Sequence, residues 1–262
     1  IDRVLAGPQR KSRVISERER LMTAYHEAGH ALVARMLPHA DPVRKVSIVA
    51  RGMMGGYTRV VPDEDRLFKT KRQFEDELAV FMAGHVSESL VFDEQSTGAA
   101  NDIERATMLA RRMVTQYGMS ENLGPLTFGH DPAQPFVGRD YGMGQEYSEE
   151  TARAIDAEIR RVIDEAYNAA SRVLHEHRDE LDMLSQLLME RETIDKDEFD
   201  ALLAGGVPEE VFRAKDEQKA RKAEEAARRG RQRQPRERDV PQRPVGGPAP
   251  NISPVSEAGG QE

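Results

Sequence analysis

The stretch "TAYHEAGHALVARM", residues 23–36, places two histidines four positions apart, with a glutamate directly after the first. Apolar side chains recur around it at three- and four-residue spacing, at Leu21, Tyr25, Ala28, Leu32 and Met36. Ser16 followed by Glu19 is a capping-box pattern in front of this run, and Pro38 ends it. The pattern predicts one amphipathic helix that carries both histidines.

His26 and His30 point to the same side of this helix, because positions four apart lie about 40° apart around its axis and one turn along it. Their ring nitrogens can therefore converge on one cation at the distances of about 2.0–2.1 Å that zinc needs. Both histidines fall at the edge of the apolar stripe, which indicates the wall of a cleft. Glu27 can take a proton from water there and pass it to a leaving amine. This H-E-x-x-H pattern predicts a zinc hydrolase of the metallopeptidase kind.

The simpler alternative is a helix with two surface histidines and a solvated glutamate. Histidine is scarce, with 7 in 262 residues, so chance rarely produces this spacing. The zinc site is therefore the favoured interpretation.

A catalytic zinc ion takes three protein ligands, so a third must come from elsewhere in the chain. The extended pattern H-E-x-x-H-x-x-G-x-x-H fails, since Val33 and Met36 stand where Gly and His are needed. A glutamate on a nearby downstream helix is also missing, because that region is predicted to form strands and a Gly-rich loop. The remaining candidates are Glu64, His85, Glu88 and Asp102.

Two short strands, residues 43–49 and 56–61, are predicted after the first helix, joined by the loop "ARGMMG". We expect them to pair antiparallel beside that helix. The turn "GMMGGY" could also leave the following strand with an exposed edge for an extended substrate.

Helical periodicity returns from Gln73 to the acidic turn "FDEQSTGAAN" and again from about Asn101. Residues 118–145 are rich in Gly and Pro and are predicted to form a long loop. A long helix is expected from Ser148 to about Glu176. Two shorter ones should follow, over Glu180–Arg191 and over "IDKDEFDALL".

The composition suits a soluble, helix-rich protein, with 38% hydrophobic and 32% charged residues. The absence of cysteine excludes disulfides, thiolate metal sites and cysteine nucleophiles. No run of 18 apolar residues occurs, so no transmembrane helix is predicted. The expected fold class is mainly α: a helical metallopeptidase domain with a small antiparallel β element near the H-E-x-x-H helix.

Charge and composition change at about residue 215. Residues 215–262 hold 11 Lys and Arg against 8 Asp and Glu, whereas residues 1–214 carry a net charge of −11. An acidic folded part is poorly suited to gripping nucleic-acid phosphates. The segment after residue 215 has almost no large apolar residue and is predicted to be disordered. Its arginines could contact anionic lipid or RNA, but a solvated tail is the favoured interpretation.

Five motifs, "YHEAGHALV", "STGAAND", "ARRMVTQYGMS", "LGP" and "SEETARAIDAEI", follow one another in a familiar order and spacing. Over about residues 1–205 the chain resembles the peptidase domain of the FtsH-type ATP-dependent zinc metalloproteases. The resemblance implies an endopeptidase with Zn²⁺ as cofactor, which degrades unfolded or membrane-extracted polypeptides delivered by an AAA+ ATPase module of the same protein. No G-x-x-x-x-G-K-[ST] occurs, so that module is not expected in this chain.

The resemblance also assigns roles to individual residues. His26 and His30 match the family's two zinc-binding histidines, and Glu27 matches its general base. Asp102 matches the aspartate that supplies the third ligand. Glu88 matches an acidic residue near the metal.

One departure concerns the third ligand. Where the family usually reads A-G-R-x-A-E-E, this chain reads "AGHVSES", so His85 replaces an arginine and Ser89 a glutamate. Because imidazole binds zinc well, His85 is the main competitor of Asp102. Without the resemblance, Asp102 would be interpreted as a helix cap or dipole partner, Glu88 as a solvated charge and His85 as a partly buried polar residue.

The organisation that the resemblance implies has three parts. Residues 1–15 look like the end of the AAA+ module, residues 16–206 like the zinc peptidase domain, and residues 207–262 form a disordered Arg/Pro-rich tail. Domains of this family assemble as hexamers. The full-length proteins are anchored to the cell membrane by an N-terminal segment outside this chain, with the peptidase on the cytoplasmic side.

Two other functions are compatible with parts of the sequence. One is a non-catalytic helical oligomerisation module with a degenerate metal site, which the intact His–Glu–His set argues against. The other is nucleic-acid binding through the Arg-rich tail. Neither explains the motif set, and no specific nucleic-acid partner is expected.

Overall fold

The computed structural model describes residues 16–50, 55–62, 66–128, 147–213, 215–217 and 220–221. The elements below belong to one compact unit that ends at Val211. The predicted junction at residues 1–15, the candidate ligand Glu64 and most of the predicted tail lie outside the described residues.

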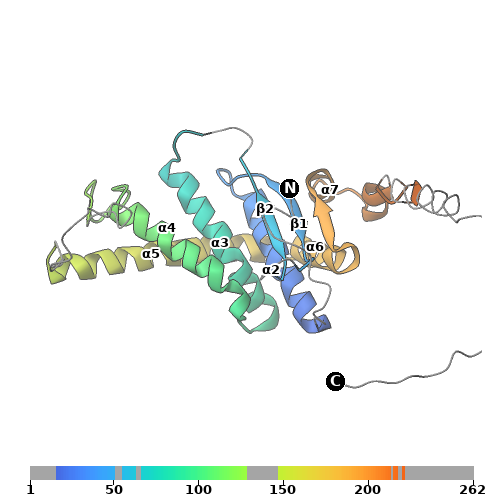
Figure 1. Ribbon diagram of the computed structural model, residues 1–262, viewed down its shortest axis with the longest axis horizontal. Helices are drawn as coiled ribbons and strands as arrows, with labels where there is room; N and C mark the ends of the chain where they lie inside the picture. The colour runs from blue at the N-terminus through green and yellow to red at the C-terminus, as the bar shows by residue number, and fades with distance from the viewer. Residues whose placement is uncertain are drawn as a thin grey trace, which may run out of the picture. The chain divides into compact units, whose positions relative to one another are not determined.

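Helix α2, Glu17–Met36, is the central helix of this unit (Figure 1). The predicted capping box is confirmed: the Glu19 amide donates to Ser16 Oγ at 3.2 Å, and the Ser16 amide donates to the Glu19 carboxylate at 3.0 Å. Every residue from Ala24 to Ala34 is buried. The sequence indicated a one-sided apolar stripe, but α2 contacts α3, α6, β1 and β2, and its four Ala residues and one Gly permit close packing on several sides.

Beside α2 lies a three-stranded antiparallel sheet in the order β2-β1-β3. Strands β1, Val43–Ser47, and β2, Tyr57–Val60, pair as predicted. Strand β3, Thr193–Asp195, adds to the other edge of β1, with Ile194 opposite Val46. The prediction of helix from Ile194 is therefore wrong at its start. A strand of three residues is too short to show a pattern, and it forms because β1 offers an edge and Ile194 is fully buried.

Helix α7, Lys196–Leu203, follows β3 directly. Asp195 and Glu198 form a capping box at its start, which explains how strand and helix can be joined without a loop. Phe199 and Leu202 of α7 are buried.

Helix α3, Lys71–Phe92, begins two residues earlier than predicted, because Thr70 and Gln73 form a capping box. It crosses α2 closely at Gly29, where a Cβ atom would lie 2.9 Å from the Ala83 carbonyl oxygen and from Ser87 Cβ. This approach brings the middle of α3 against the histidine face of α2. Asp93, with a φ of 51°, ends the helix in the left-handed conformation.

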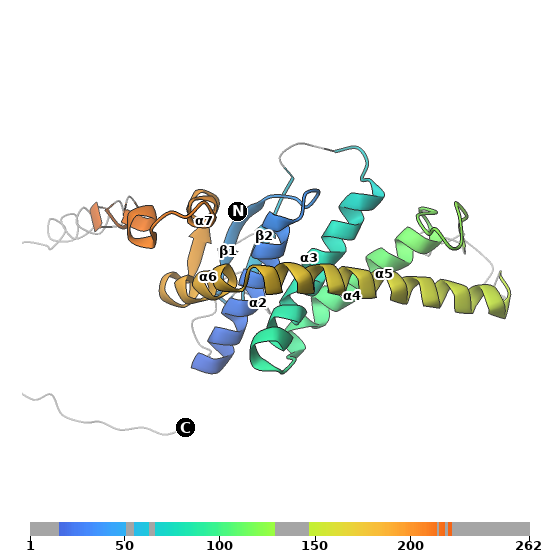
Figure 2. The same ribbon diagram turned by 180° about the vertical axis from the view of Figure 1, so that it is seen from behind.

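The other predicted helices are present. They are the helices α4, Ala100–Thr115, α5, Glu149–Glu176, and α6, Arg178–Arg191. A 3₁₀ turn that was not predicted, η1, Thr97–Ala99, precedes α4. Helices α4 and α5 contact each other and α3, and Figure 2 shows α5 running in front of α3. Residues 129–146 of the predicted long loop lie outside the described part.

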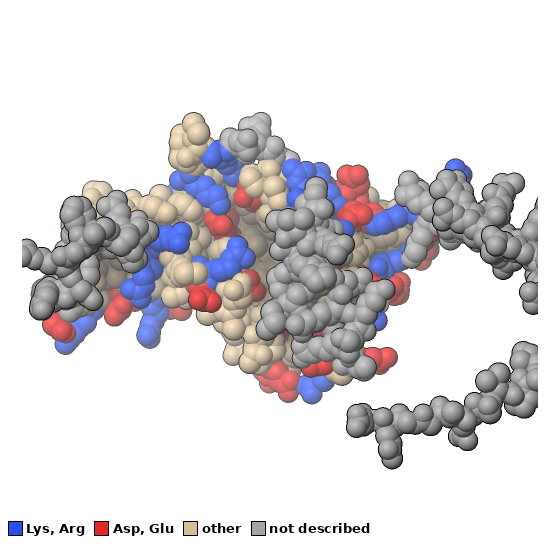
Figure 3. Space-filling view, viewed as in Figure 1, with Lys and Arg blue, Asp and Glu red and all other residues tan. Residues whose placement is uncertain are grey.

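The structure confirms the predicted fold class, mainly helical with a small antiparallel sheet beside α2. Residues 208–213 are helical, where the sequence predicted the beginning of a disordered tail. None of the described helices is both long and apolar enough to cross a membrane. On the face shown in Figure 3, basic and acidic side chains are interspersed over the described surface.

Candidate metal centre

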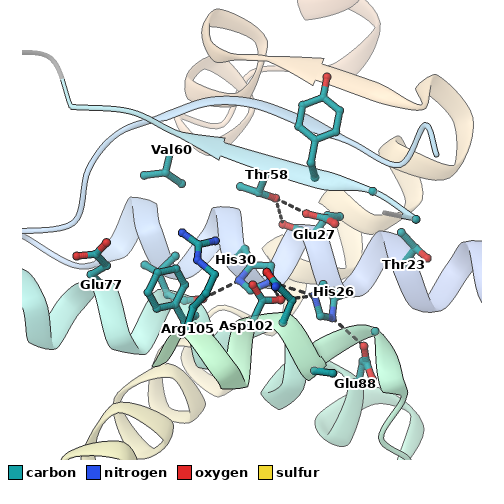
Figure 4. Close-up of a pocket in the computed structure, with 18 of the residues that line it drawn as sticks. Thr23, His26, Glu27, His30, Thr58, Val60, Glu77, Glu88, Asp102 and Arg105 are labelled. Atoms are coloured by element: carbon teal, nitrogen blue, oxygen red, sulfur yellow. Dashed lines mark hydrogen bonds and ion pairs between the residues drawn. The ribbon is translucent and has the colours of Figure 1, made fainter. Parts of the chain in front are cut away.

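Three side chains from two helices converge beside the middle of α2 (Figure 4). The Nε2 atoms of His26 and His30 lie 3.1 Å apart. Asp102 Oδ2, from the first turn of α4, lies 3.3 Å from His26 Nε2 and 3.4 Å from His30 Nε2. Within the described residues, this is the one set of His, Cys, Asp and Glu side chains arranged closely enough to hold a metal ion.

In each of the two histidines, the Nδ1 nitrogen forms a hydrogen bond with an acceptor outside the cluster. His30 Nδ1 donates to the Val80 carbonyl oxygen at 2.6 Å, and His26 Nδ1 donates to Glu88 Oε1 at 2.7 Å. In a neutral imidazole the other nitrogen, Nε2, then carries a lone pair. Two lone pairs and a carboxylate oxygen therefore face one another, which is stable only with positive charge among them.

The spacing fits a zinc ion. A tetrahedral ion with ligands at about 2.0–2.1 Å separates any two of its ligand atoms by about 3.3 Å. The three observed separations, 3.1, 3.3 and 3.4 Å, lie around this value. Two imidazole nitrogens and one carboxylate oxygen are also a donor set that zinc accepts, with a fourth position left for water or substrate.

The electrostatics of the cluster also favour positive charge. Burial lowers the pKa of His26, but hydrogen bonds with Asp102 and Glu88 outweigh burial and raise this pKa to about 10. Burial raises the pKa of Asp102, yet its contacts with His26 and His30 hold it far below its usual range. The cluster is thus suited to hold positive charge.

Glu88 helps to place Asp102 beside α2, although Asp102 lies 72 positions after His30 in the sequence. Its carboxylate is 1% exposed, and the oxygen that does not hold His26 accepts the Ser96 amide at 2.7 Å. Ser96 Oγ in turn accepts the Gly98 amide, which starts η1 and then α4. One buried carboxylate therefore orients a histidine and fixes the turn that delivers Asp102.

Glu27 approaches the cluster from the sheet side. It is 6% exposed, and its Oε2 accepts a hydrogen bond from Thr58 Oγ1 on β2 at 2.7 Å. Burial raises the pKa of Glu27, while His26, His30 and Thr58 offset part of this effect. A carboxylate with a raised pKa is a stronger base, which suits proton transfer.

Two glycines that the sequence analysis did not single out make room for these groups. A Cβ atom on Gly84 of α3 would lie 2.5 Å from His26 Nε2 and 2.6 Å from His30 Nε2. A Cβ atom on Gly56 would lie 2.8 Å from Glu27 Oε1. Gly84 stands beside His85 in "AGHVSES", so it could have been flagged, but only the fold shows that it faces the histidines.

His85, the main competitor of Asp102, lies elsewhere. The His85 ring packs against Tyr167 of α5, with ring centroids 6.2 Å apart, so the structure does not bring His85 to the cluster. Asp102 does not cap α4: Ala99 is the N-cap residue and no side chain caps the helix. The carboxylate is turned toward the histidines instead.

The cluster lines an open cleft of about 860 Å³ between α2, β2, α3 and α4. Its walls include His26, Glu27, His30 and Asp102, together with Thr58 and Val60 of the edge strand β2. The converging side chains are therefore accessible from this cleft.

The sequence model of peptidase family M41 matches residues 13–202. The chain belongs to this family. It is 69% identical over 202 residues to ATP-dependent zinc metalloprotease FtsH 1 of Sphaerobacter thermophilus, an alignment that covers 77% of the chain and 31% of that relative.

Two further relatives are similar in the same region. The chain is 67% identical to FtsH 1 of Thermomicrobium roseum over 202 residues, which are 77% of the chain and 31% of the relative. It is 49% identical to FtsH of Bacillus subtilis over 213 residues, which are 80% of the chain and 33% of the relative. Both are named ATP-dependent zinc metalloproteases, and the chain spans about a third of their length.

Proposed function

We propose that this chain is a zinc endopeptidase and that it forms the proteolytic part of an ATP-dependent protease. The observation that carries the proposal is the convergence of His26 Nε2, His30 Nε2 and Asp102 Oδ2, with Glu27 on the same helix as the two histidines. The names of the relatives support zinc as the metal and ATP-dependent proteolysis as the activity.

In this proposal His26, His30 and Asp102 hold the zinc ion, and Glu88 orients His26 through its Nδ1–H group. A bound zinc ion supplies a Lewis acid, which polarises a carbonyl oxygen and makes water a stronger acid. His85 has no role at the metal.

Glu27 is the general base of the proposed reaction. Its carboxylate takes a proton from the attacking water and later gives a proton to the leaving amine of the cleaved peptide bond. Thr58 holds the carboxylate by donating to Oε2, so that Oε1 remains for the proton.

The substrate is an unfolded polypeptide bound in extended form. Strand β2 is at the edge of the sheet and, among the described residues, pairs with β1 alone. Its free edge lies along the cleft, so an extended segment can add to the sheet and place a peptide bond over the cluster.

The remaining parts of the proposal concern the whole protein. An AAA+ ATPase module joined at residues 1–15 delivers the substrate, and six peptidase domains enclose the active sites. An N-terminal membrane anchor places this peptidase on the cytoplasmic side of the cell membrane. Residues 207–262 form the Arg/Pro-rich tail, without a specific nucleic-acid partner.

The test combines metal analysis with peptide hydrolysis on the 262-residue chain. We expect one zinc ion per chain and cleavage of an unfolded fluorogenic peptide that a chelator abolishes and zinc restores. Glu27→Gln should keep zinc but lose turnover by about 10²–10⁴-fold, because it removes the base and neither histidine. His26→Ala should lose both zinc binding and peptide hydrolysis.

Two results would contradict the proposal. Turnover of Glu27→Gln close to that of the wild type would exclude Glu27 as the base. Zinc binding without any hydrolysis, both in this chain and after fusion to its ATPase module, would favour the non-catalytic assembly module.

A further inference from the structure

The cationic side chains that line the cleft differ in whether they form an ion pair with a described carboxylate. Lys and Arg line the described cleft at three positions, Arg66, Lys69 and Arg105. Arg66 donates to Asp41 at 2.8 Å, and Lys69 donates to Glu77 at 2.8 Å. Among the described residues, no carboxylate forms an ion pair with Arg105.

Arg105 is held in place by an aromatic ring instead. Its guanidinium carbon lies 4.3 Å from the centroid of the Phe81 ring on α3. A guanidinium stacked on a ring keeps its N–H edge free to bind a carboxylate, and the ring limits its rotamers. The ring therefore orients the Arg105 side chain, and no described carboxylate occupies its N–H groups.

The position of Arg105 is next to the proposed reaction site. Arg105 follows Asp102 by three residues on α4, so both side chains lie on the same side of that helix. Phe81 follows Val80, whose carbonyl oxygen holds His30. Figure 4 shows the Arg105 side chain rising beside His30 and Asp102, toward the part of the cleft where Val60 and Glu77 lie.

We propose that Arg105, stacked on Phe81, is a specificity-determining residue that binds an acidic side chain of the polypeptide close to the scissile bond. This inference rests on the proposed function, because it assumes that a polypeptide lies along β2 across the cluster. A substrate Glu or Asp on the His30 side of the cluster then meets the Arg105 guanidinium, which can donate two parallel hydrogen bonds to it. The corresponding amide loses the charge–charge attraction.

The experiment compares pairs of fluorogenic peptides that differ by Glu or Gln at one position, scanned over three residues on each side of the cleaved bond. The ratio of kcat/KM within each pair is independent of the fraction of active enzyme. For the wild type we expect Glu to be preferred at one position by about 1.5–5-fold, as for an exposed ion pair. The preference should shrink as the salt concentration rises.

The variants are Arg105→Gln, Arg105→Glu and the control Arg111→Gln. Arg111 is an exposed arginine on the same helix and does not line the cleft. We expect the Glu/Gln ratio to fall to about 1 in Arg105→Gln and to drop below 1 in Arg105→Glu. It should keep its wild-type value in Arg111→Gln.

A binding measurement separates this inference from the proposed function. The same peptides, labelled for fluorescence anisotropy, are titrated with zinc-loaded Glu27→Gln and with that variant carrying Arg105→Gln in addition. A Glu preference that depends on Arg105 supports the inference even where turnover is absent, a result that would count against the proposed function alone.

Equal Glu/Gln ratios in wild type and Arg105→Gln at every position would overturn the inference and leave zinc-dependent cleavage intact. A loss of zinc affinity in Arg105→Gln with no change in any ratio would also overturn it, since Arg105 would then act by positioning Asp102.

Discussion

Gly84 carries no side chain, and the two imidazoles occupy the space in front of it. Gly84→Ala should lower zinc affinity by at least about tenfold, because the new methyl group displaces Nε2 of both histidines. The helical content should be unchanged, since Ala is about 1 kcal/mol better than Gly inside a helix. Chelator competition measures the affinity, and circular dichroism measures the helix.

Gly55→Ala is the matched control for this substitution. A Cβ atom on Gly55 would lie 3.5 Å from Thr23 Oγ1, an ordinary contact. Its zinc affinity should equal that of the wild type. If Gly84→Ala binds zinc as well as Gly55→Ala does, the imidazoles can move freely and the cluster is not held as described.

The third ligand can be identified by comparing three substitutions. Glu88→Gln should lower zinc affinity by about 10–100-fold, as expected for a residue that orients a ligand. Asp102→Asn should lower zinc affinity further, because it changes a proposed ligand. His85→Ala should bind zinc like the wild type, because its ring packs on Tyr167. Wild-type affinity in Asp102→Asn together with a loss in His85→Ala would exclude the assignment.

Some of these residues could be predicted from the sequence, and others could not. His26, Glu27 and His30 follow from helical geometry, since all three lie within one turn and a half of α2. Asp102 was reached through the family resemblance, because no local pattern connects it to a residue 72 positions away. The support from Thr58 to Glu27 depends on how β2 packs on α2, which spacing does not encode.

At the scale of an element, helix α5 is tied to the turn after α4 through one buried carboxylate. Glu158, 3% exposed, accepts hydrogen bonds from Ser120 Oγ at 2.9 Å, Asn122 Nδ2 at 2.7 Å and both Nε and Nη2 of Arg161 at 2.9 and 2.8 Å. The hydrogen bonds with Arg161, followed by those with Asn122 and Ser120, outweigh burial and lower the pKa of Glu158 to about 2. This network holds residues 120–122 against α5.

Glu158→Gln should lower the free energy of unfolding by about 2–3 kcal/mol at pH 7. Because the folded-state pKa lies below the ordinary value of 4.5, this contribution is complete above about pH 5 and is lost as the pH falls toward 2. Urea unfolding of both proteins at pH 7 and pH 3.5 measures the difference.

Glu165→Gln is the control, since Glu165 pairs with the same arginine from the same helix but its side chain is 62% exposed. It should change the free energy of unfolding by less than about 0.5 kcal/mol. Equal effects of the two substitutions, or an effect of Glu158→Gln that does not shrink at pH 3.5, would show that the network contributes nothing specific.

The helices show which elements a sequence predicts well. Ser16 and Glu19 gave the start of α2, and Ser148 gave the start of α5, because capping is local. Thr70 and Gln73 carry the same signal for α3, which the predicted start at Gln73 overlooked. Strand β3 could not be predicted, because it exists only through pairing with β1 nearly 150 residues earlier.

At the scale of the whole unit, the last elements pack against the first ones. β3 and α7 contact β1, and α6 contacts α2. Truncation after Arg191 should therefore abolish cooperative unfolding and zinc binding, although every proposed ligand remains in the chain. The removal exposes the edge of β1 and deletes Phe199, which is fully buried and whose loss alone should cost about 3–5 kcal/mol.

Truncation after Arg221 is the comparison for this deletion. It removes the segment whose composition cannot form a core, so the melting temperature and zinc affinity should stay at the wild-type values. A large drop in melting temperature would show that the predicted tail packs after all. A folded, zinc-binding chain that ends at Arg191 would show that β3 and α7 are dispensable.

The proposed metal ligands come from α2 and α4, which the whole of α3 separates along the chain. Under the proposed function, the ion therefore acts as a removable cross-link between two distant helices, and the unfolded chain offers no comparable site. The stability of the folded enzyme then depends on the free zinc concentration. At 100 times the dissociation constant, zinc adds about 2.7 kcal/mol to the free energy of unfolding, and each further tenfold increase adds about 1.4 kcal/mol. In a zinc-starved cell the same protease would become more susceptible to unfolding and to degradation by other proteases.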